Sequence, residues 1–339
     1  MKVEDFIDPY AGQSWGDLGV RVLSSGKQVS VTLGYPAAGI TDALASQLAE
    51  FLGVDEIDLE VHFAAPPSQG FDKVKHVVLV ASGKGGVGKS TTAVNLALAL
   101  DAEGAKVGLL DADIYGPSQG MMLGVAEGRK PEIKDGKFFE PIRAHGLKSM
   151  SMSYMVTDRT PMVWRGPMAS GALQQIIGQT QWGDLDYLIV DMPPGTGDIQ
   201  LTISQKVPVA GAVIVTTPQD IALLDALKGI EMFSKVDIPV LGILENMSVH
   251  ECPKCGHLSH LFGAEGGRKV AADLGVPLLG ELPLALSIRE QADGGKPTVK
   301  AEPDSPISGL YRDAARHLAA QLWANPRSSK APTISMVDD

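Results

Sequence analysis

Cysteine and long apolar runs are scarce in this chain, and both features limit the classes of protein to which it can belong. Only two of the 339 residues are cysteine, so no disulfide framework can form and a cytoplasmic location is expected. No stretch approaches the run of about 18 apolar residues that a membrane span needs. The first residues, MKVEDFIDPY, lack the apolar core of a secretory signal and the Arg/Ser-rich character of a transit peptide. The sequence therefore predicts no membrane partner.

Positive charge is also in short supply. The chain has 29 Lys and Arg against 40 Asp and Glu, a formal net charge of −11 at pH 7, and no compensating basic run. Binding to a nucleic-acid backbone relies on clustered Lys and Arg, so this composition argues against a nucleic-acid partner. Hydrophobic residues make up 44% of the chain, which is ordinary for a globular protein with a full core.

Composition and periodicity divide the chain into four parts. Residues 1–63 predict a small α+β accessory domain, and the Pro-, Ser- and Gly-containing residues 64–74 predict a linker. Residues 75–324 predict the main domain, and residues 325–339 a disordered tail. The elements expected in the small domain are strands at 20–23, 28–33 and 57–63 and a helix at 40–52.

From residue 75 onward, apolar strands alternate with helical segments. This alternation is typical of an α/β fold with a doubly wound, mostly parallel sheet. Between residues 131 and 150 the alternation breaks, and Asp135 and Gly136 predict a hairpin turn there. The expected strands are 76–82, 106–111, 187–191, 212–217, 240–245 and 277–279, and the expected helices are 90–103, 168–179, 197–206, 220–233, 264–274, 287–292 and 304–323.

A glycine-rich segment follows the first of these strands. Gly83, four residues, Gly88, Lys89 and Ser90 fit the phosphate-loop pattern G-x-x-x-x-G-K-[ST], with an apolar strand before it and a helix after it. Glycines allow backbone N–H groups to curl around phosphate oxygens. Lys89 supplies a charge for the β- and γ-phosphates, and the Ser90 hydroxyl can ligate Mg²⁺. The nucleotide-binding loop is therefore expected to comprise Gly83, Lys84, Gly85, Gly86, Val87, Gly88, Lys89, Ser90 and Thr91.

Two carboxylates are candidates for the chemistry that a nucleotide hydrolase needs beside a phosphate loop. Asp191 ends the apolar strand 187–191, as the metal-linked acid of a Walker B strand does. Asp113 follows the strand 106–111, whose carboxyl end we expect beside the phosphate loop, where Asp113 can position water or Mg²⁺. Asp111 is the weaker candidate, because it could simply end that strand.

Asn246 follows the strand 240–245 and is the candidate for contact with the base of the nucleotide. Amide groups can pair with the donor and acceptor atoms of adenine. Taken alone, this residue is explained equally well as a turn-forming Asn.

Both cysteines lie in one short segment, CPKCGHLSH, from Cys252 to His260. A redox pair normally begins a helix, and Gly256 and the histidines after it argue against a helix here. A zinc site would have to use His257 and His260, but the single residue between Cys255 and His257 is too short for a relaxed tetrahedron. A [4Fe–4S] cluster takes four thiolates, so two chains would have to share it across a two-fold axis. From the residues alone, a zinc site and an iron–sulfur cluster are supported almost equally well.

Together these segments resemble a known family. The loop with its extra lysine, Lys84, is similar to the deviant Walker A loop of the class that contains MinD, ParA and nitrogenase iron protein. Within that class, the chain resembles the Mrp/ApbC-type iron–sulfur cluster carriers over residues 75–295. Residues 1–63 resemble the small MIP-type α+β domain that precedes the ATPase in many of these carriers, although Tyr35 stands where relatives often have a cysteine. The segments that carry the resemblance to the carriers are 83–91, 111–118, 163–168, 191–198, 217–220, 246–247 and 252–255.

The resemblance implies a role for each residue of the nucleotide site. It implies that Lys84 and Lys89 contact phosphates, with Lys84 reaching across a homodimer to the nucleotide of the partner. It further implies that Ser90 binds Mg²⁺ and that Asp113 and Asp191 act at the switch regions. By the same resemblance Asn246 lies at the base of ATP.

For the cysteines, the resemblance implies a [4Fe–4S] cluster that bridges two chains through Cys252 and Cys255. The implied function is an ATP-dependent carrier that hydrolyses ATP and transfers the cluster to recipient apoproteins, with assembly scaffold proteins as further partners. Two alternatives stay open, a MinD/ParA-like positioning ATPase and a zinc-binding P-loop ATPase without cluster transfer. Positioning ATPases usually carry a basic amphipathic helix or DNA-facing basic residues, which the segment SSKAPTISMVDD lacks.

Overall fold

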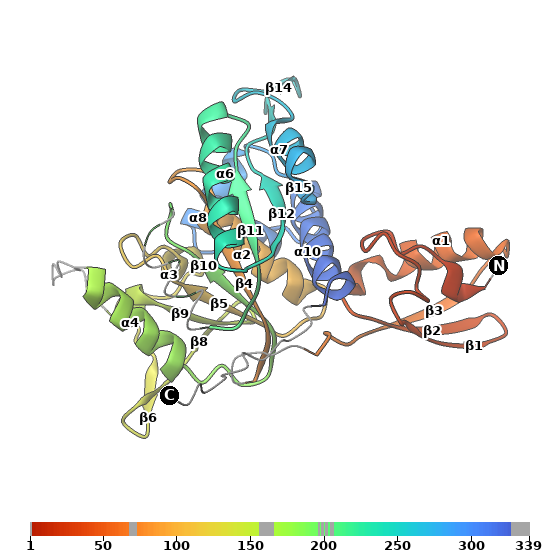
Figure 1. The fold of residues 1–339 in the computed structure, drawn as a ribbon, viewed down its shortest axis with the longest axis horizontal. Coiled ribbons are helices and arrows are strands. Elements are labelled where there is room, and N and C mark those ends of the chain that lie inside the picture. Colours follow the sequence, from red (N-terminus) through yellow and green to blue (C-terminus); the bar gives the residue numbers. More distant parts are fainter. Residues whose placement is uncertain are drawn as a thin grey trace, which may run out of the picture.

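The structure is a computed structural model that describes residues 2–67, 73–155, 166–195, 197, 200, 203 and 207–326. A large sheet flanked by helices forms its main body, and a small sheet with one long helix lies to one side (Figure 1). Among the described helices, none has the length and apolar character required to cross a membrane.

The main sheet has eight strands in the order β15-β12-β11-β4-β10-β5-β9-β8. All neighbouring pairs are parallel except β8 and β9. Each strand predicted after residue 75 is confirmed in this sheet, so the expected α/β fold with a mostly parallel sheet is confirmed. The strands are β4 (Val74–Ala81), β5 (Val107–Asp111), β8 (Ile142–Ala144), β9 (Leu147–Ser151), β10 (Leu185–Asp191), β11 (Val209–Thr216), β12 (Val240–Glu245) and β15 (Leu278–Glu281).

Helices cover both faces of this sheet, which explains the nearly continuous apolar runs of its strands. Alternate residues of β4 belong to two separate clusters: Val78 and Val80 pack with α2 and α10, whereas Val77 and Leu79 pack with α4, α6 and α7. Most of the predicted helix 197–206 lies outside the described residues. The helices of this part are α2 (Lys89–Ala102), α3 (Gln119–Met122), α4 (Gly166–Gln179), α6 (Asp220–Lys235), α7 (Gly266–Leu274), α8 (Leu286–Asp293), α9 (Thr298–Ala301) and α10 (Pro306–Ala324).

The break in the alternation between residues 131 and 150 is a pair of short hairpins. The predicted turn at Asp135 and Gly136 is confirmed, since both residues have the positive φ, 53° and 66°, that a tight hairpin turn of this kind requires. This turn joins β6 (Glu132–Lys134) to β7 (Phe138–Glu140). The second hairpin adds β9 to the main sheet, parallel to β5.

The first 63 residues build a three-stranded sheet and a helix that pack against α10. The sheet pairs β1 (Arg21–Ser25) with β2 (Gln28–Leu33) antiparallel and β2 with β3 (Asp58–Phe63) parallel, and α1 spans Thr41–Leu52. Tyr10 anchors this unit, because its hydroxyl donates to Asp313 Oδ1 of α10 (2.7 Å) and accepts from Arg316 Nε (2.9 Å). Two short 3₁₀ turns, Val3–Asp5 and Ala38–Ile40, complete the elements of this unit.

Tyr35, the residue at the position where related domains often have a cysteine, lies in the core of this small unit. It is fully buried, and its hydroxyl donates to Asp8 Oδ2 (3.2 Å). Burial and the neighbouring Asp8 carboxylate raise the pKa of Tyr35, so the phenol stays protonated. The residue therefore serves packing and hydrogen bonding.

A candidate nucleotide site and a cysteine hairpin

The phosphate loop connects β4 to α2, and close packing requires glycine at two of its positions. A Cβ on Gly83 would lie 2.2 Å from the backbone of Asp225 in α6. Gly88 has a φ of +82°, and a Cβ there would lie 2.1 Å from Asn246 Nδ2. Gly85 and Gly86 are exposed, while Val87 is buried under the loop. The loop therefore keeps its backbone open on one side and packed on the other.

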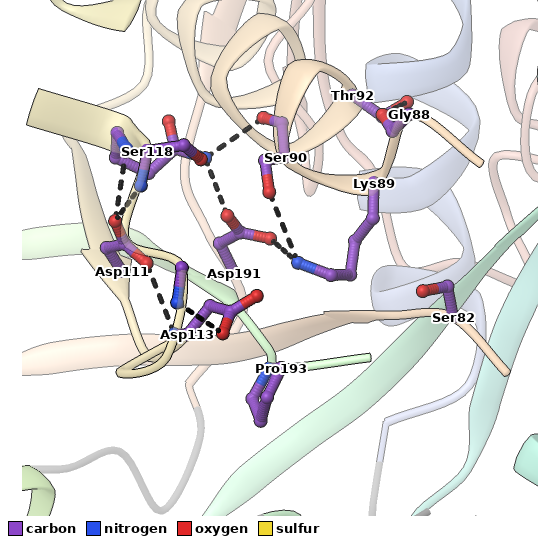
Figure 2. A network of polar contacts seen from close by, with 12 residues as sticks. Ser82, Gly88, Lys89, Ser90, Thr92, Asp111, Asp113, Ser118, Asp191 and Pro193 are labelled. Atoms are coloured by element: carbon purple, nitrogen blue, oxygen red, sulfur yellow. Dashed lines mark hydrogen bonds and ion pairs between the residues drawn. The ribbon is translucent and has the colours of Figure 1, made fainter. Parts of the chain in front are cut away.

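Lys89 and Asp191 form the centre of the site (Figure 2). The ammonium of Lys89, the first residue of α2, donates to Asp191 Oδ1 at the end of β10, and these side chains are only 6% and 0% exposed. Lys89 Nζ also lies 3.3 Å from the Ser90 hydroxyl. Lys89 and Ser90 of the phosphate loop and Asp191 of the strand end, predicted from two separate motifs, are thus in one connected group.

A glutamine that the sequence analysis missed completes this group. Gln119, the first residue of α3, is 1% exposed. Its Nε2 donates to Asp191 Oδ2 (2.8 Å) and to the backbone carbonyl of Ser90 (3.0 Å). The only available signal was its place directly after the segment 111–118, which by itself does not show where the side chain points.

Asp111 holds the loop that follows β5. Its carboxylate accepts from the backbone N–H groups of Ser118 and Gln119 and from the Ser151 hydroxyl, each at 3.0 Å. Burial, and then the nearby charge of Asp191, raise the pKa of this carboxyl group. Asp111 therefore has a mainly structural environment, in keeping with its lower rank as a candidate.

Asp113 lies in the same loop but is only partly buried, and Figure 2 shows it near Asp191. Its Oδ1 accepts from the backbone N–H of Gly116 (3.3 Å). Burial raises its pKa, the charge of Lys89 lowers it, and that of Asp191 raises it. Its carboxylate is thus within electrostatic reach of the central pair without being bonded to it.

The strand order is a detail that the sequence analysis did not supply. The strand that precedes Asp113 does not pair with the phosphate-loop strand, because β10 lies between β4 and β5. Asp191 is therefore in the strand adjacent to the phosphate loop, and Asp113 comes from one strand further away. The order of strands depends on which neighbours pack together in three dimensions, which alternation along the chain does not encode.

Lys84 contacts the residue that precedes α6. Its ammonium donates to Gln219 Oε1 at 3.4 Å, and it has no ion pair within the described part of the chain. A partly exposed ammonium without a carboxylate partner is available to an anion from outside the chain.

Asn246 supports the phosphate loop through a side-chain hydrogen bond. Its Nδ2 donates to the carbonyl of Val87 (2.9 Å), and its backbone N–H donates to Thr216 O (2.8 Å). The side chain is 8% exposed. The structure thus gives Asn246 a supporting contact with the loop, which the sequence analysis did not foresee.

The two cysteines lie in a small hairpin between β13 (His250–Glu251) and β14 (Leu258–Ser259). Cys252 N–H donates to His257 O (3.0 Å), and Gly256 N–H donates to Cys252 O (2.9 Å), which closes the turn. The backbone N–H groups of Lys254 and Cys255 lower the pKa of the Cys252 thiol. Both cysteines are free, Cys252 partly buried and Cys255 exposed, so the turn presents two thiols to a metal.

The histidines do not complete a metal site in one chain. His260 Nδ1 lies 2.9 Å from the carbonyl of Ser248, so this nitrogen is used as a donor. Among the described residues, no group of three or more His, Cys, Asp or Glu side chains is arranged to hold a metal ion. Two thiols from Cys252 and Cys255 are therefore what a single chain provides.

Two segments named in the sequence analysis lie partly outside the described residues. Residues 163–165 of the segment 163–168 are outside the described residues, and so is Asp198 of the segment 191–198.

A phosphate loop on a mostly parallel sheet, with an acidic strand end beside it, defines a P-loop NTPase. The family model that matches residues 73–319 is described as the NUBPL iron-transfer P-loop NTPase. The chain belongs to this family, and the predicted resemblance to iron–sulfur cluster carriers is confirmed.

Similar proteins and structures agree with this assignment. The chain is 63% identical over 269 residues to the iron–sulfur cluster carrier protein of Pseudomonas fragi, covering 78% of this chain and 94% of that protein. It is 51% identical over 263 residues to the iron–sulfur cluster transfer protein NUBPL of Mus musculus, covering 77% of this chain and 82% of that protein.

Among solved structures, a nucleotide-binding protein from Archaeoglobus fulgidus in complex with ADP matches with a TM-score of 0.60 and 36% identity, over 70% of this chain and 92% of that one. MinD with Mg-ADP from Pyrococcus horikoshii matches with a TM-score of 0.55 and 22% identity, over 71% and 94% of the two chains. The second likeness concerns the fold alone.

Proposed function

We propose that this protein is an ATP-dependent iron–sulfur cluster carrier and assembly factor that works as a homodimer. The observation that carries the proposal is the Cys252–Cys255 turn, which offers two thiols that no third ligand joins among the described residues, on a chain that also has a phosphate loop. Family membership and the names of the relatives support it.

In this proposal the phosphate loop, residues 83–91, binds ATP together with Mg²⁺. The donor set fits the metal, because the Ser90 hydroxyl and the Asp191 carboxylate are hard oxygen ligands and lie around one ammonium. Bound Mg²⁺ would neutralise charge on the β- and γ-phosphates. Lys89 binds phosphate oxygens, and Asp113 positions the attacking water. Asn246 supports the loop at Val87 on the side of the base.

The cluster is cargo, held by the thiolates of Cys252 and Cys255 from each of two chains. A [4Fe–4S] cluster takes four thiolates, and one chain supplies two, so two copies meet at the cysteine hairpins. The lowered pKa of Cys252 favours the thiolate that binds iron.

Lys84 is assigned to the same dimer. Among the described residues, its ammonium has only a long contact with Gln219 of its own chain, so a phosphate of the partner's nucleotide would give it a stronger one. ATP binding would then stabilise the pairing of chains on which the cluster depends. This arrangement couples ATP hydrolysis to transfer of the cluster to recipient apoproteins, with assembly scaffold proteins as further partners.

The division into residues 1–63, linker 64–74, ATPase domain 75–324 and tail 325–339 is kept as part of the proposal, with the first part in recruitment or regulation. The cytoplasmic location inferred from the low cysteine content is kept as well.

Anaerobic reconstitution with iron and sulfide tests the proposal. We expect a brown protein with about four irons and four sulfides per dimer, and loss of both in a Cys252→Ala/Cys255→Ala double variant that still binds ATP. Stoichiometric zinc, with no iron-dependent absorbance after reconstitution, would instead favour the zinc-binding alternative. A MinD/ParA-like positioning role would be favoured if the double variant behaved like the wild type in every cluster-transfer assay.

A further inference from the structure

Gln119 occupies a position that no motif assigned to it. Its side chain is 1% exposed and lies between the end of β10 and the start of α2. Its Nε2 bonds both to the Asp191 carboxylate and to the Ser90 carbonyl, so one amide group connects the two residues proposed to hold Mg²⁺. The contacts of Ser90 and Asp191 are visible in Figure 2.

The backbone of Gln119 is fixed independently of its side chain. Its N–H donates to Asp111 Oδ2 (3.0 Å), and the same oxygen accepts from the Ser118 N–H and from the Ser151 hydroxyl. At the next residue, a Cβ on Gly120 would lie 2.6 Å from the Ser153 hydroxyl, so α3 packs closely on the segment after β9. A rigid backbone aims the Gln119 amide at the site.

The orientation of this amide follows from its neighbours. Both atoms that face Nε2, Asp191 Oδ2 and Ser90 O, are acceptors. A flipped amide would bring its oxygen against these two oxygens, which is repulsive, so the nitrogen must face them.

The oxygen of the same amide group makes no such contact. Gln119 Oε1 is buried and has no hydrogen-bond partner among the described residues. A buried carbonyl oxygen without a partner costs free energy, so a hydrogen bond from a water molecule at this position would be stabilising. Mg²⁺ in nucleotide sites keeps several water molecules, and these are strong hydrogen-bond donors.

We propose that Gln119 is a positioning residue of the nucleotide site: its Nε2 orients the Asp191 carboxylate, and its Oε1 accepts a hydrogen bond from a water molecule carried by Mg²⁺. This inference rests on the proposed function, because it needs a Mg–nucleotide complex at Ser90 and Asp191. Removal of a residue that hydrogen-bonds to a metal ligand typically lowers the metal affinity by about 10- to 100-fold.

The test measures how much Mg²⁺ increases the affinity of the full chain for ADP. Calorimetry gives the ADP affinity once in EDTA and then at a series of Mg²⁺ concentrations. The variant is Gln119→Met, which keeps the length of the side chain without its polar atoms, with Gln119→Leu as a second variant. The matched control is Gln175→Leu, since Gln175 is exposed on α4 and bonds only to Gln179 (3.0 Å) among the described residues.

We expect the Mg²⁺ concentration for half-maximal strengthening to rise about 10- to 100-fold in both Gln119 variants, with ADP affinity in EDTA unchanged within about 2-fold. Gln175→Leu should match the wild type in both conditions. Circular dichroism checks that each variant is folded. If one Gln119 variant is misfolded, the Mg²⁺ dependence of the other variant tests the inference.

The inference is overturned if a folded Gln119 variant keeps the Mg²⁺ dependence of the wild type, or if its ADP affinity falls equally with and without Mg²⁺, as a merely structural role would cause. If the wild type itself binds no Mg–ADP, the proposed function fails first, and this inference fails with it.

Discussion

The Lys89 ammonium contacts the Asp191 carboxylate although 102 residues separate the two in sequence. Both side chains are closed to solvent. A phosphate group would compete with Asp191 for Lys89, while Mg²⁺ would compete with Lys89 for Asp191. Binding of Mg–ATP would therefore replace one buried ion pair by two separate charge pairings, which makes the pair a sensitive point for mutation.

Lys89→Ala should abolish ATP hydrolysis, with a loss of at least about 100-fold, because the phosphates lose their cation. It should also destabilise the fold by about 3–5 kcal/mol, since Asp191 stays buried without its partner. Phosphate release and urea unfolding measure the two effects. A Lys89→Ala/Asp191→Asn double variant should recover stability but not hydrolysis. Lys235→Ala, which removes an exposed pair with Glu231, is the control and should cost less than about 1 kcal/mol.

Lys84→Ala should separate binding from hydrolysis. If Lys84 acts on the nucleotide of the partner, the variant should bind ADP within about 3-fold of the wild type while its ATP hydrolysis falls at least about 10-fold. Lys228→Ala is a matched control, because the Lys228 side chain is exposed on α6 and pairs only with Asp225 (3.0 Å) among the described residues. A Lys84 variant that hydrolyses ATP normally as a dimer would rule out the cross-dimer role.

The partly buried Cys252 thiol should be more reactive than a free cysteine thiol. Backbone N–H groups of Lys254 and Cys255 lower its pKa, so a larger fraction is thiolate at neutral pH. In a Cys255→Ser variant, which keeps those N–H groups, the pH midpoint of iodoacetamide labelling should lie below that of N-acetylcysteine. Labelling should stop after cluster reconstitution of the wild type. A midpoint equal to that of N-acetylcysteine would contradict the hydrogen-bonded turn.

Asp111 should make the stability of the protein fall as pH rises through the weakly acidic range. Its folded-state pKa is raised to about 7 by burial and by Asp191, so the folded chain binds the proton where the unfolded chain has lost it. Stability therefore decreases between about pH 4 and pH 7. In Asp111→Asn this decrease should be smaller by at least about 1 kcal/mol, measured by urea unfolding at pH 5 and pH 8. Asp293→Asn, at an exposed carboxylate, should leave the slope unchanged.

Glu103 should be critical for the contact between the first 63 residues and the main sheet. Its fully buried carboxylate pairs with Arg312 Nε (2.7 Å) and Arg316 Nη1 (2.6 Å) and accepts from the backbone N–H of Gly39 (2.8 Å). Glu103→Ala leaves two arginines without their partner, so we expect a loss of about 3–5 kcal/mol.

Urea unfolding measures this loss, and limited proteolysis should cut the first 63 residues faster in the Glu103 variant. Arg289→Ala, which breaks exposed pairs at 3.2 and 3.5 Å, should cost less than about 1 kcal/mol. Equal losses of stability in the Glu103 and Arg289 variants would show that burial of the Glu103 pairs does not increase their contribution to the free energy of unfolding.

Local patterns predicted much of this molecule correctly. The strand ending at Asp191 and the helix starting at the phosphate loop depend on apolar runs and glycines a few residues apart, and both were placed within a few residues. The hairpin turn at Asp135 was predicted for the same reason, because the dipeptide alone requires an unusual backbone conformation.

Contacts between distant segments could not be predicted in this way. The position of β10 between β4 and β5, the loop contact of Asn246 and the place of Gln119 all depend on how buried surfaces fit together. No motif singled out Glu103, and only its packing against α10 made it a buried partner of two arginines.

The sequence by itself determined the phosphate loop, the alternation of strands and helices and the isolated cysteine pair, because each is set by residue types at short, fixed spacings. Only the tertiary structure decided that Lys89 and Asp191 form a buried pair and that a single glutamine joins Asp191 to Ser90. The physical reason is burial: hydrogen bonds and charges inside the fold must find partners, and the packing of distant elements determines which partners are within reach.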